Sequence, residues 1–254
     1  MRQRRVTGIE ERLAPYAALI LRGEILMPDS AVYYPRWYDR PSPRYVLPEG
    51  FDRTYVEIGC GRGRFINTLA AGDPGGLYIG VEGCKTFVLR ALEKTKEAGL
   101  ENSRYIDCFI NDATSAFAEE SIDGFFLNFS DPWPKTRHAD RRLTSPLKAA
   151  AYLKVLKPGG FVTVKTDGEA FFEYSLTSFI DVGFRIETEQ EGSASWPTGN
   201  VLCEDTDLAI CTDKTARRGG ILPPAISAIN TPTEYELKFR AENKQIYCFI
   251  AYKR

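Results

Sequence analysis

The sequence has little of what metal centres and disulfide frameworks are built from. Of its 254 residues only one is histidine, His138, and its six cysteines are scattered singly, without a C-x-x-C pair. No run of eighteen apolar residues is present, and no apolar stretch follows the basic N-terminus. A metal site, disulfides, a membrane span and a secretory signal are therefore not expected. We expect a cytoplasmic protein, and the sequence implies no obligate protein partner.

The chain also lacks an excess of positive charge. Its 33 Lys and Arg residues are balanced by 34 Asp and Glu residues, which gives a formal net charge of −1. Such a chain does not coat nucleic acid by bulk charge, so any binding depends on local basic clusters. Three clusters are present: Arg2, Arg4 and Arg5; Lys135, Arg137, Arg141 and Arg142; and Lys214, Arg217 and Arg218. Because such runs are usually solvated surface, each needs support from its surroundings.

From Thr54 onward the sequence alternates short apolar strands with amphipathic helices. Strands are predicted at 55–58, 77–81, 105–110, 124–129, 161–165 and 245–251, and helices at 64–71, 85–98, 145–156 and 168–180. This alternation predicts an α/β fold with a largely parallel, doubly wound sheet. Ligands of such sheets bind beyond the carboxyl ends of the strands, where the strand order reverses.

The segments outside this alternation suggest how the chain is divided. Residues 1–50 are predicted to hold a short helix at 10–21 and then an extension rich in proline and aromatic residues, without regular structure. Residues 51–254 are predicted to form the main domain. An insertion at about 190–230, rich in Gly, Ser, Thr, Asp and Pro, interrupts it, with a small hairpin expected around 207–211.

The first chemical motif follows the first predicted strand. Glu57 opens the run E-I-G-C-G-R-G, whose glycines are Gly59, Gly61 and Gly63. Such glycines let the backbone turn tightly and approach a ligand at a helix N-terminus. Glu82 closes the next strand, where a carboxylate can accept both ribose hydroxyls of a nucleoside. The spacing differs from the G-x-G-x-x-G of dinucleotide folds, so a nucleoside site is favoured over a dehydrogenase fingerprint or a plain glycine turn.

Asp112 follows the third predicted strand and leaves two interpretations open. Its carboxylate can accept a hydrogen bond from an adenine amino group, or it can cap the helix that starts near Thr114. The sequence alone does not separate these two roles.

The second motif, N-F-S-D-P-W-P-K-T-R-H at 128–138, follows the apolar fourth strand. Its two prolines bracket Trp133 and hold Asp131 at the strand end. The tryptophan could stack on a base, or it could lie in the core beneath a proline-rich turn. Four basic residues close to the same strand end favour the first reading, because they suit a passing phosphate backbone: Lys135, Arg137, Arg141 and Arg142. We expect His138 to contact phosphate or solvent rather than to act as a general base.

These motifs resemble the bacterial tRNA (guanine-N7)-methyltransferase family. The resemblance rests on V-E-I-G-C-G-R-G-R-F (56–65), Y-I-G-V-E (78–82), L-N-F-S-D-P-W-P-K-T-R-H (127–138), R-R-L-T-S-P (141–146), L-K-P-G-G (156–160), V-K-T-D (164–167), F-E-Y-S-L-x-S-F (172–179), T-E-Y-E-x-K-F (233–239) and I-Y (246–247). It implies a Rossmann-like class I methyltransferase fold, with a mostly parallel seven-stranded sheet and helices on both faces. It also implies transfer of the methyl group of S-adenosylmethionine to N7 of a variable-loop guanine in tRNA.

The resemblance also assigns roles to individual residues. Those on the family's cofactor-binding positions are Glu57, Glu82, Asp112 and Asp131, and Asp131 is also its proposed catalytic residue. Those on its substrate-contact positions are Lys135, Asp167, Thr233, Glu234, Tyr235 and Glu236. The run from Arg137 to Arg142 is similar to its tRNA-contact loop. This chain departs from the family at Thr136, where a second basic residue is usual, and in its longer connection over 190–232.

The implied chemistry suits the residues at hand. Guanine N7 bears a lone pair and no proton, so its methylation needs positioning and electrostatics rather than a general base. Asp131 would stabilise the positive charge that develops on guanine, and Asp167 would accept from its N1–H and amino group. Three alternatives stay open: methylation of an exocyclic amine, as in families with D-P-P-Y at this strand end, a non-catalytic tRNA-binding module, and an NAD-dependent dehydrogenase.

Overall fold

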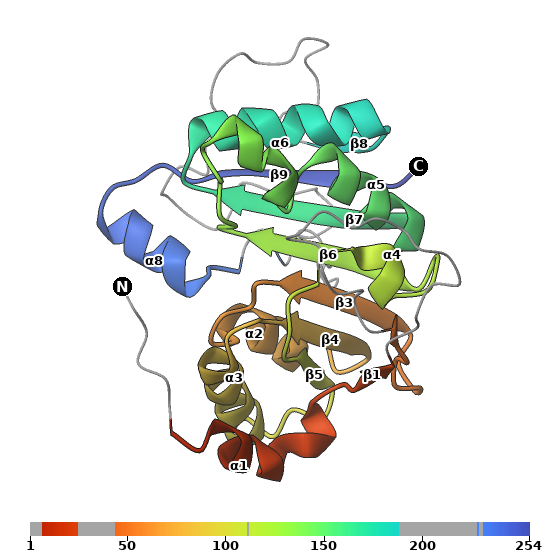
Figure 1. Ribbon diagram of the computed structural model, residues 1–254, viewed down its shortest axis with the longest axis vertical. Helices are drawn as coiled ribbons and strands as arrows, with labels where there is room; N and C mark the ends of the chain where they lie inside the picture. The colour runs from red at the N-terminus through yellow and green to blue at the C-terminus, as the bar shows by residue number, and fades with distance from the viewer. Residues whose placement is uncertain (1–6, 25–43, 111, 188–227, 229–230) are drawn as a thin grey trace, which may run out of the picture.

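The computed structural model describes residues 7–24, 44–110, 112–187, 228 and 231–254. Its centre is a seven-stranded sheet in the order β5–β4–β3–β6–β7–β9–β8 (Figure 1). The strands are β3 (Arg53–Ile58), β4 (Gly76–Val81), β5 (Ser103–Ile106), β6 (Ile122–Asn128), β7 (Leu156–Thr166), β8 (Arg185–Glu187) and β9 (Tyr247–Tyr252). The first five run parallel, and β9 is antiparallel to both of its neighbours. The predicted α/β class and the mostly parallel seven-stranded sheet are confirmed.

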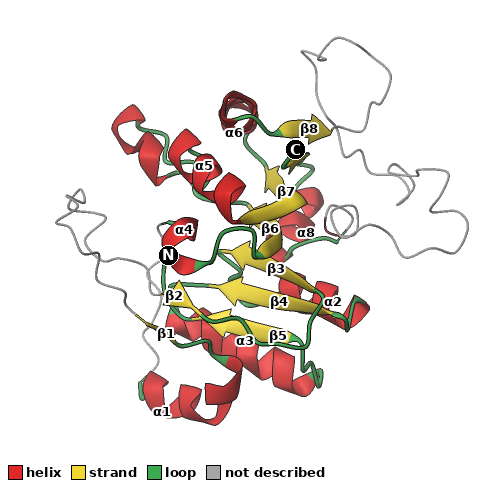
Figure 2. Ribbon diagram, turned by 90° about the vertical axis from the view of Figure 1, so that its right-hand side faces the viewer, coloured by secondary structure: helices red, strands yellow, loops and turns green. Residues whose placement is uncertain are grey.

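Helices cover both faces of this sheet, also as predicted (Figure 2). On one face lie α1 (Ile9–Leu13), α2 (Arg64–Gly72) and α3 (Lys85–Glu97), whose apolar residues join one core cluster. On the other face lie α4 (Ala113–Ala116), α5 (Pro146–Val155) and α6 (Glu169–Val182), which share a second cluster. The last helix, α8 (Glu234–Ala241), lies beside the carboxyl end of β7 (Figure 1).

The strand order explains where a site can form. From β3 the chain builds outward to β4 and β5, and it then crosses back to place β6 on the other side of β3. The connections that follow β3 and β6 therefore leave in different directions, which opens a crevice at the carboxyl ends of these strands. Both strands are buried on their two faces, so the crevice rests on a rigid base.

The N-terminal segment differs from the single helix predicted at 10–21. The α-helix ends at Leu13, and Ala14–Leu19 form a 3₁₀ helix. Pro15 has no amide hydrogen to donate to the carbonyl four residues earlier, so the α-helix cannot continue through it. Ile20 then pairs with Tyr105 as a parallel bridge beside β5, which ties this segment to the sheet.

The proline-rich extension, predicted to be irregular, contains some regular structure. β1 (Gly23–Glu24) pairs in antiparallel fashion with β2 (Arg44–Tyr45). Tyr45 is buried, and its ring packs near Phe117 at the end of α4. The burial of Tyr45, which the sequence pattern does not predict, packs β2 against the rest of the domain.

Two strand boundaries were predicted wrongly. The third strand ends at Ile106 rather than 110, because its partner β4 ends at Val81, which pairs with Ile106. The strand predicted at 161–165 begins at Leu156, which pairs with Ile122. An irregularity in the register between Ile122 and Gly124 accommodates the K-P-G-G sequence near the start of this strand.

Several predictions lie outside the described residues. They are the basic clusters at Arg2, Arg4 and Arg5 and at Lys214, Arg217 and Arg218, the hairpin at 207–211, and all of the 190–230 insertion except Ala228. The division of the chain at residue 50 stays a prediction. Within the described ranges no helix is long and apolar enough to cross a membrane, and no three potential metal ligands cluster.

Candidate active site

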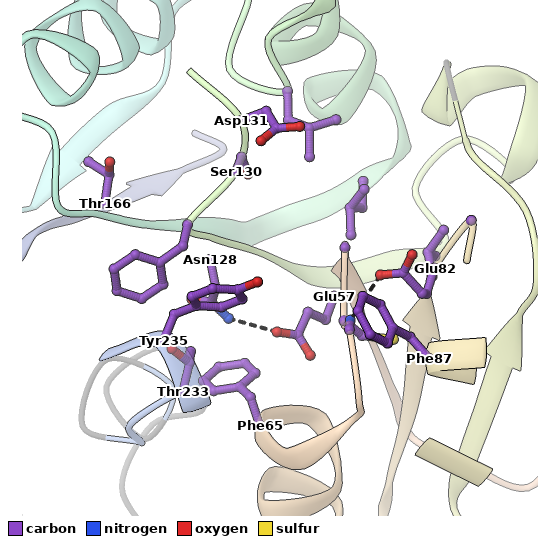
Figure 3. Close-up of a pocket in the computed structure, with 18 of the residues that line it drawn as sticks. Glu57, Phe65, Glu82, Phe87, Asn128, Ser130, Asp131, Thr166, Thr233 and Tyr235 are labelled. Atoms are coloured by element: carbon purple, nitrogen blue, oxygen red, sulfur yellow. Dashed lines mark hydrogen bonds between the residues drawn. The ribbon is translucent and has the colours of Figure 1, made fainter. Parts of the chain in front are cut away.

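A cleft of about 720 Å³ lies at the carboxyl ends of the central strands. The predicted site residues that line it are Glu57, Gly59, Gly61, Glu82, Asp131, Arg141, Asp167, Thr233, Glu234 and Tyr235. The predicted residues that lie outside its lining are Gly63, Asp112, Lys135, Arg137, Arg142 and Glu236. The fold thus gathers most of the selected residues from widely separated segments into one place (Figure 3).

The three glycines after β3 all have left-handed backbone angles, with φ of 83° at Gly59, 54° at Gly61 and 73° at Gly63. A side chain at Gly63 would lie 2.6 Å from the Cβ atom of Ala91, so this glycine lets α2 pack closely against α3. Added Cβ atoms at Gly59 and Gly61 would meet nothing within 4 Å. These two positions therefore combine a left-handed turn with open space on the cleft side.

Glu82 is fixed where β4 ends. Its Oε2 accepts a hydrogen bond from the Gly61 amide at 3.1 Å, and its Oε1 accepts one from the Cys84 amide at 2.8 Å. Each carboxylate oxygen has a further lone pair, so this pairing leaves acceptor capacity for a ligand. The carboxylate is therefore oriented in advance and linked directly to the glycine loop.

Glu57 is buried beneath the cleft and only 3% exposed. Its Oε1 accepts from the Asn128 side chain at 2.9 Å, whereas its buried Oε2 has no partner among the described residues (Figure 3). Burial raises the pKa of Glu57 to about 8, and the Asn128 hydrogen bond only partly opposes this. The carboxyl group is therefore mostly neutral at pH 7, and a ligand that bonds to Oε2 would satisfy it.

Asp112 caps α4. Its Oδ1 accepts from the Thr114 amide at 2.9 Å and from the Thr114 hydroxyl at 2.8 Å. The capping role left open by the sequence is thereby confirmed. A contact from Oδ2 to an adenine amino group is compatible with this geometry and stays a prediction.

The segment that carries Asp131 is held in a strained turn. Phe129 and Trp133, which flank it, have φ of 50° and 40°, values that non-glycine residues seldom adopt. Arg142 holds the turn from outside, because its guanidinium donates to the Pro132 carbonyl at 2.8 Å and to the Trp133 carbonyl at 3.2 Å. Arg142, predicted to contact tRNA, thus has a positioning role for the loop.

Trp133 is half-buried and lines the cleft, so the alternative that it lies in the core is wrong. Its ring is parallel to that of His138, with centroids 5.7 Å apart and an interplanar angle of 3°. The guanidinium of Arg141 lies 5.1 Å from the Trp133 centroid. The tryptophan therefore belongs to a stack of cationic and aromatic groups at the mouth of the cleft.

Glu236 lies away from the cleft. It is buried, and its carboxylate pairs with Lys165 of β7 at 2.9 Å and with Arg240 at 2.9 Å. Lys165 also donates to the Thr231 carbonyl at 2.9 Å. The structure therefore gives Glu236, predicted to contact substrate, the task of fastening α8 to the sheet.

The start of α8 supplies the wall opposite Asp131 (Figure 3). The Thr233 hydroxyl caps the helix by accepting from the Glu236 amide at 2.9 Å. Tyr235 is 60% exposed on the cleft side, and its ring packs near Phe129 and Phe239, with centroids 6.4 and 6.1 Å away. An exposed aromatic face supported from behind can receive a flat ring.

Comparison with known proteins agrees with this geometry. A family model described as "Putative methyltransferase" matches residues 52–202. The tRNA (guanine-N(7)-)-methyltransferase of Brevibacillus brevis is 32% identical over 248 residues, which cover 97% of this chain and 96% of the relative. The enzyme of the same name from a Geobacillus species is 35% identical over 224 residues, covering 83% and 89%. This chain belongs to the tRNA (guanine-N(7)-)-methyltransferase family.

The family resemblance found in the sequence is thereby confirmed, and the dehydrogenase alternative is set aside. Among solved structures, the antibiotic-resistance methyltransferase Kmr is similar with a TM-score of 0.49 and 13% identity, over 81% of this chain and 88% of that one. The cofactor of this methyltransferase is S-adenosylmethionine. The residues present fit it, because Glu57 has an unpartnered buried oxygen and Glu82 is an oriented carboxylate at a glycine loop.

The sequence patterns did not predict two further residues that line the cleft, Phe109 and Lys148. Phe109 is 76% exposed, and its ring covers Gly83, where a Cβ atom would approach it to 2.2 Å. Lys148 of α5 also lines the cleft and is buried. Neither residue belongs to a motif. The pattern of a helix or loop also does not show which of its faces will line a cleft formed by distant strands. The only usable signal was the position of Phe109 near the carboxyl end of the strand predicted at 105–110.

The raised pKa of Glu57 predicts a pH-dependent stability. Because the pKa rises from an ordinary value near 4.5 to about 8 on folding, the neutral carboxyl supports the fold at low pH. This contribution is lost progressively as the pH rises from about 4.5 to about 8, with a slope of at most about 1.4 kcal/mol per pH unit, and is gone above the folded-state pKa. Glu57→Gln mimics the neutral acid and should lose this dependence. Urea unfolding of both proteins from pH 5 to pH 8.5 checks this, and parallel profiles would contradict it.

Proposed function

We propose that this protein transfers the methyl group of S-adenosylmethionine to N7 of a variable-loop guanine in tRNA, forming N7-methylguanosine. The observation that carries the proposal is the order of groups along the cleft. Gly59, Gly61 and Glu82 form a nucleoside-type end, and Asp131 lies beside a basic, aromatic mouth. The relatives described above bear the name of this activity. A cytoplasmic location remains part of the proposal.

The groups that line the cleft suit a reaction without proton abstraction. When bound, S-adenosylmethionine supplies an electrophilic methyl group on a sulfonium centre. Burial raises the pKa of the Cys60 and Cys108 thiols, so both stay neutral near pH 7. Guanine N7 attacks with its own lone pair and needs neither a thiolate nor a base. The chain's task is therefore to position the purine and to stabilise positive charge as it forms on the ring.

We assign the guanine to the space between Asp131 and the start of α8. Tyr235 offers a ring face on which the purine can stack. Asp167 is exposed at the end of β7, and within the described part of the chain its one ion pair is a loose contact with Lys244 at 3.9 Å. Its carboxylate can accept from guanine N1–H and the amino group. These contacts occupy the edge opposite N7, which leaves N7 directed at the methyl donor.

We assign the tRNA backbone to the loop that follows Asp131. Lys135 and Arg137 are exposed there, and Arg141 reaches the cleft mouth. The net charge of −1 supplies no long-range attraction, so binding rests on these short-range contacts. Arg142 is excluded from this set, because its guanidinium is used by the carbonyls of the Asp131 turn.

Separate alanine substitutions at Arg141 and Arg142 should distinguish a phosphate contact, assigned to Arg141, from support of the Asp131 turn, assigned to Arg142. Arg141→Ala should weaken tRNA binding and reduce the slope of log K against log salt by about 0.7–0.9, the value for one lost phosphate contact. Arg142→Ala should leave that slope unchanged and lower turnover, because the turn that holds Asp131 loses its brace. Titrations at several salt concentrations and single-turnover rates measure both effects. Equal salt slopes in the two variants would contradict the division.

The proposed reaction is tested by incubating the protein with methyl-labelled donor and unmodified tRNA, then digesting the RNA to nucleosides. We expect the label in N7-methylguanosine. A label on an exocyclic amine would instead favour the related base methyltransferases. Binding of S-adenosylmethionine and tRNA without any transfer would identify a non-catalytic binding module. As a control, Asp131→Asn should abolish most of the labelling by the same preparation.

A further inference from the structure

Lys148 occupies a position that is unfavourable for a lysine. It is only 7% exposed, and its ammonium group makes no hydrogen bond or ion pair with the described residues. It is the third residue of α5, whose first turn contains no acidic side chain. The N-terminus of a helix carries partial positive charge, so an ammonium group there is repelled. Burial, absence of a partner and helix polarity all act against this residue.

The neighbouring residue makes the arrangement more unusual. Leu147, one position earlier in α5, is 61% exposed, so the helix exposes a leucine and buries a lysine. Folding alone would favour the opposite arrangement. Burial also lowers the pKa of Lys148, an effect that the carboxylate of Asp112 partly opposes. Burying an ammonium group without a partner destabilises the fold, so the presence of Lys148 here points to a ligand that accepts a hydrogen bond from it.

The position of Lys148 in the cleft indicates which part of a ligand it meets. It lines the cleft together with Cys108, Phe109 and Ile110, which follow β5. Asp112 lies outside the cleft lining, but its carboxylate interacts electrostatically with Lys148, and its Oδ1 takes both capping hydrogen bonds of α4. Oδ2 of Asp112 makes no hydrogen bond with the described residues. A hydrogen-bond donor in the cleft lining thus lies within electrostatic reach of an acceptor oxygen that the helix cap does not use.

A donor beside an acceptor matches one edge of adenine. On that edge the C6 amino group donates and the adjacent N1 accepts. We infer that Lys148 donates a hydrogen bond to N1 of the adenine ring of S-adenosylmethionine, next to Asp112 at the amino group, and that Lys148 thereby selects adenosine over other nucleosides. The inference rests on the cofactor binding in this cleft. It adds a specificity-determining residue that lies outside every motif of the sequence.

An RNA phosphate is a less suitable partner for this lysine. The phosphate backbone of a folded RNA stays at the protein surface, where the exposed residues Lys135 and Arg137 lie. Lys148 is buried and lies within electrostatic reach of Asp112, away from those exposed residues. A purine that enters the cleft can reach it without carrying a phosphate charge into the interior.

The test compares two ligands that differ only at the N1 position. S-adenosylhomocysteine and its 1-deaza analogue, in which a C–H group replaces N1, are titrated calorimetrically into the wild-type protein and Lys148→Met. The wild type should bind S-adenosylhomocysteine roughly 10- to 100-fold more tightly than the analogue, the range for a charge-assisted hydrogen bond. Lys148→Met should bind the two ligands alike. Lys154→Met, at an exposed position of the same helix, should keep the wild-type ratio.

A second measurement separates ligand binding from a structural role. Methionine has a similar length and no charge, so Lys148→Met should raise the urea midpoint of the ligand-free protein. A lower midpoint would show that Lys148 serves the fold and would overturn the inference. An unchanged ligand ratio in Lys148→Met, or weaker binding of tRNA alone, would also overturn it. If the wild type binds no S-adenosylhomocysteine, the methyltransferase assignment fails instead, which is a distinguishable result.

Discussion

Replacing Asp131 with asparagine should slow methyl transfer by about 2–4 kcal/mol of activation free energy, the range seen when one preorganised electrostatic group is removed. The substitution keeps the shape of the side chain and removes its charge. Asp131 lines the cleft at the end of β6, where the strained turn between Phe129 and Trp133 fixes its position. Its carboxylate would lose the ability to stabilise positive charge on the purine. Single-turnover rates with saturating tRNA measure this directly.

The control for this prediction lies in the same loop. Asp140→Asn removes a charge at an exposed position outside the cleft lining and should leave the rate close to that of the wild type. Affinity for S-adenosylmethionine should fall much less than the rate in Asp131→Asn, if the role of Asp131 is to stabilise charge. Near-normal turnover in that variant would refute the assignment. An equal loss of affinity and rate would make Asp131 a binding residue only.

Glu236→Ala should destabilise the protein by about 3–5 kcal/mol, the usual cost of leaving one member of a buried ion pair without its partner. Among the described residues, Lys165 would keep the Thr231 carbonyl as its one hydrogen-bond acceptor in its buried position. Because Lys165 belongs to β7 whereas Arg240 lies in α8 itself, the substitution removes the ion pair that joins this helix to the sheet. Urea unfolding monitored by circular dichroism at pH 7 gives the change in unfolding free energy.

Two further variants show whether the buried pair is responsible. Glu242→Ala, which disrupts exposed ion pairs with Lys238 and Lys244, should cost less than about 1 kcal/mol. Glu236→Leu combined with Lys165→Met removes both charges and should recover most of the loss from Glu236→Ala. A loss below about 1 kcal/mol in Glu236→Ala would mean that α8 is held mainly by its aromatic contacts. In that case Glu236 would again be available as a substrate residue.

The parts of the site that the sequence predicted depend on short segments. The run from Glu57 to Gly63 combines an apolar strand, a glycine turn and a helix start, and each of these is fixed by neighbouring residues. The same holds for Asp131, because the apolar strand before it and the prolines after it are adjacent in sequence. Local patterns of this kind place a residue at the end of a strand, and the parallel sheet then brings such ends together.

The parts that the sequence did not predict depend on long-range packing. Glu236 was assigned to substrate because it belongs to a motif, yet its partner Lys165 lies 71 residues earlier. Arg142 looked like part of a basic run, whereas its hydrogen bonds to the Pro132 and Trp133 carbonyls appear only once the loop is folded. Lys148 gave no signal, since its burial depends on how α5 meets the other elements. For Glu236 and Arg142 the polar partner, and for Lys148 the packing of α5, decides the role rather than the residue type.

The antiparallel strand β9 has a consequence for synthesis of the protein. It inserts between β7 and β8, so the sheet cannot close until residues 247–252 have left the ribosome. At about 5–20 residues per second, roughly 4–17 s separate the emergence of β7 from that of β9. During this interval β7 is an unpaired edge of eleven mostly buried residues, the kind of edge to which other nascent chains can add. The nascent chain therefore depends on protection of β7 until its last strand arrives.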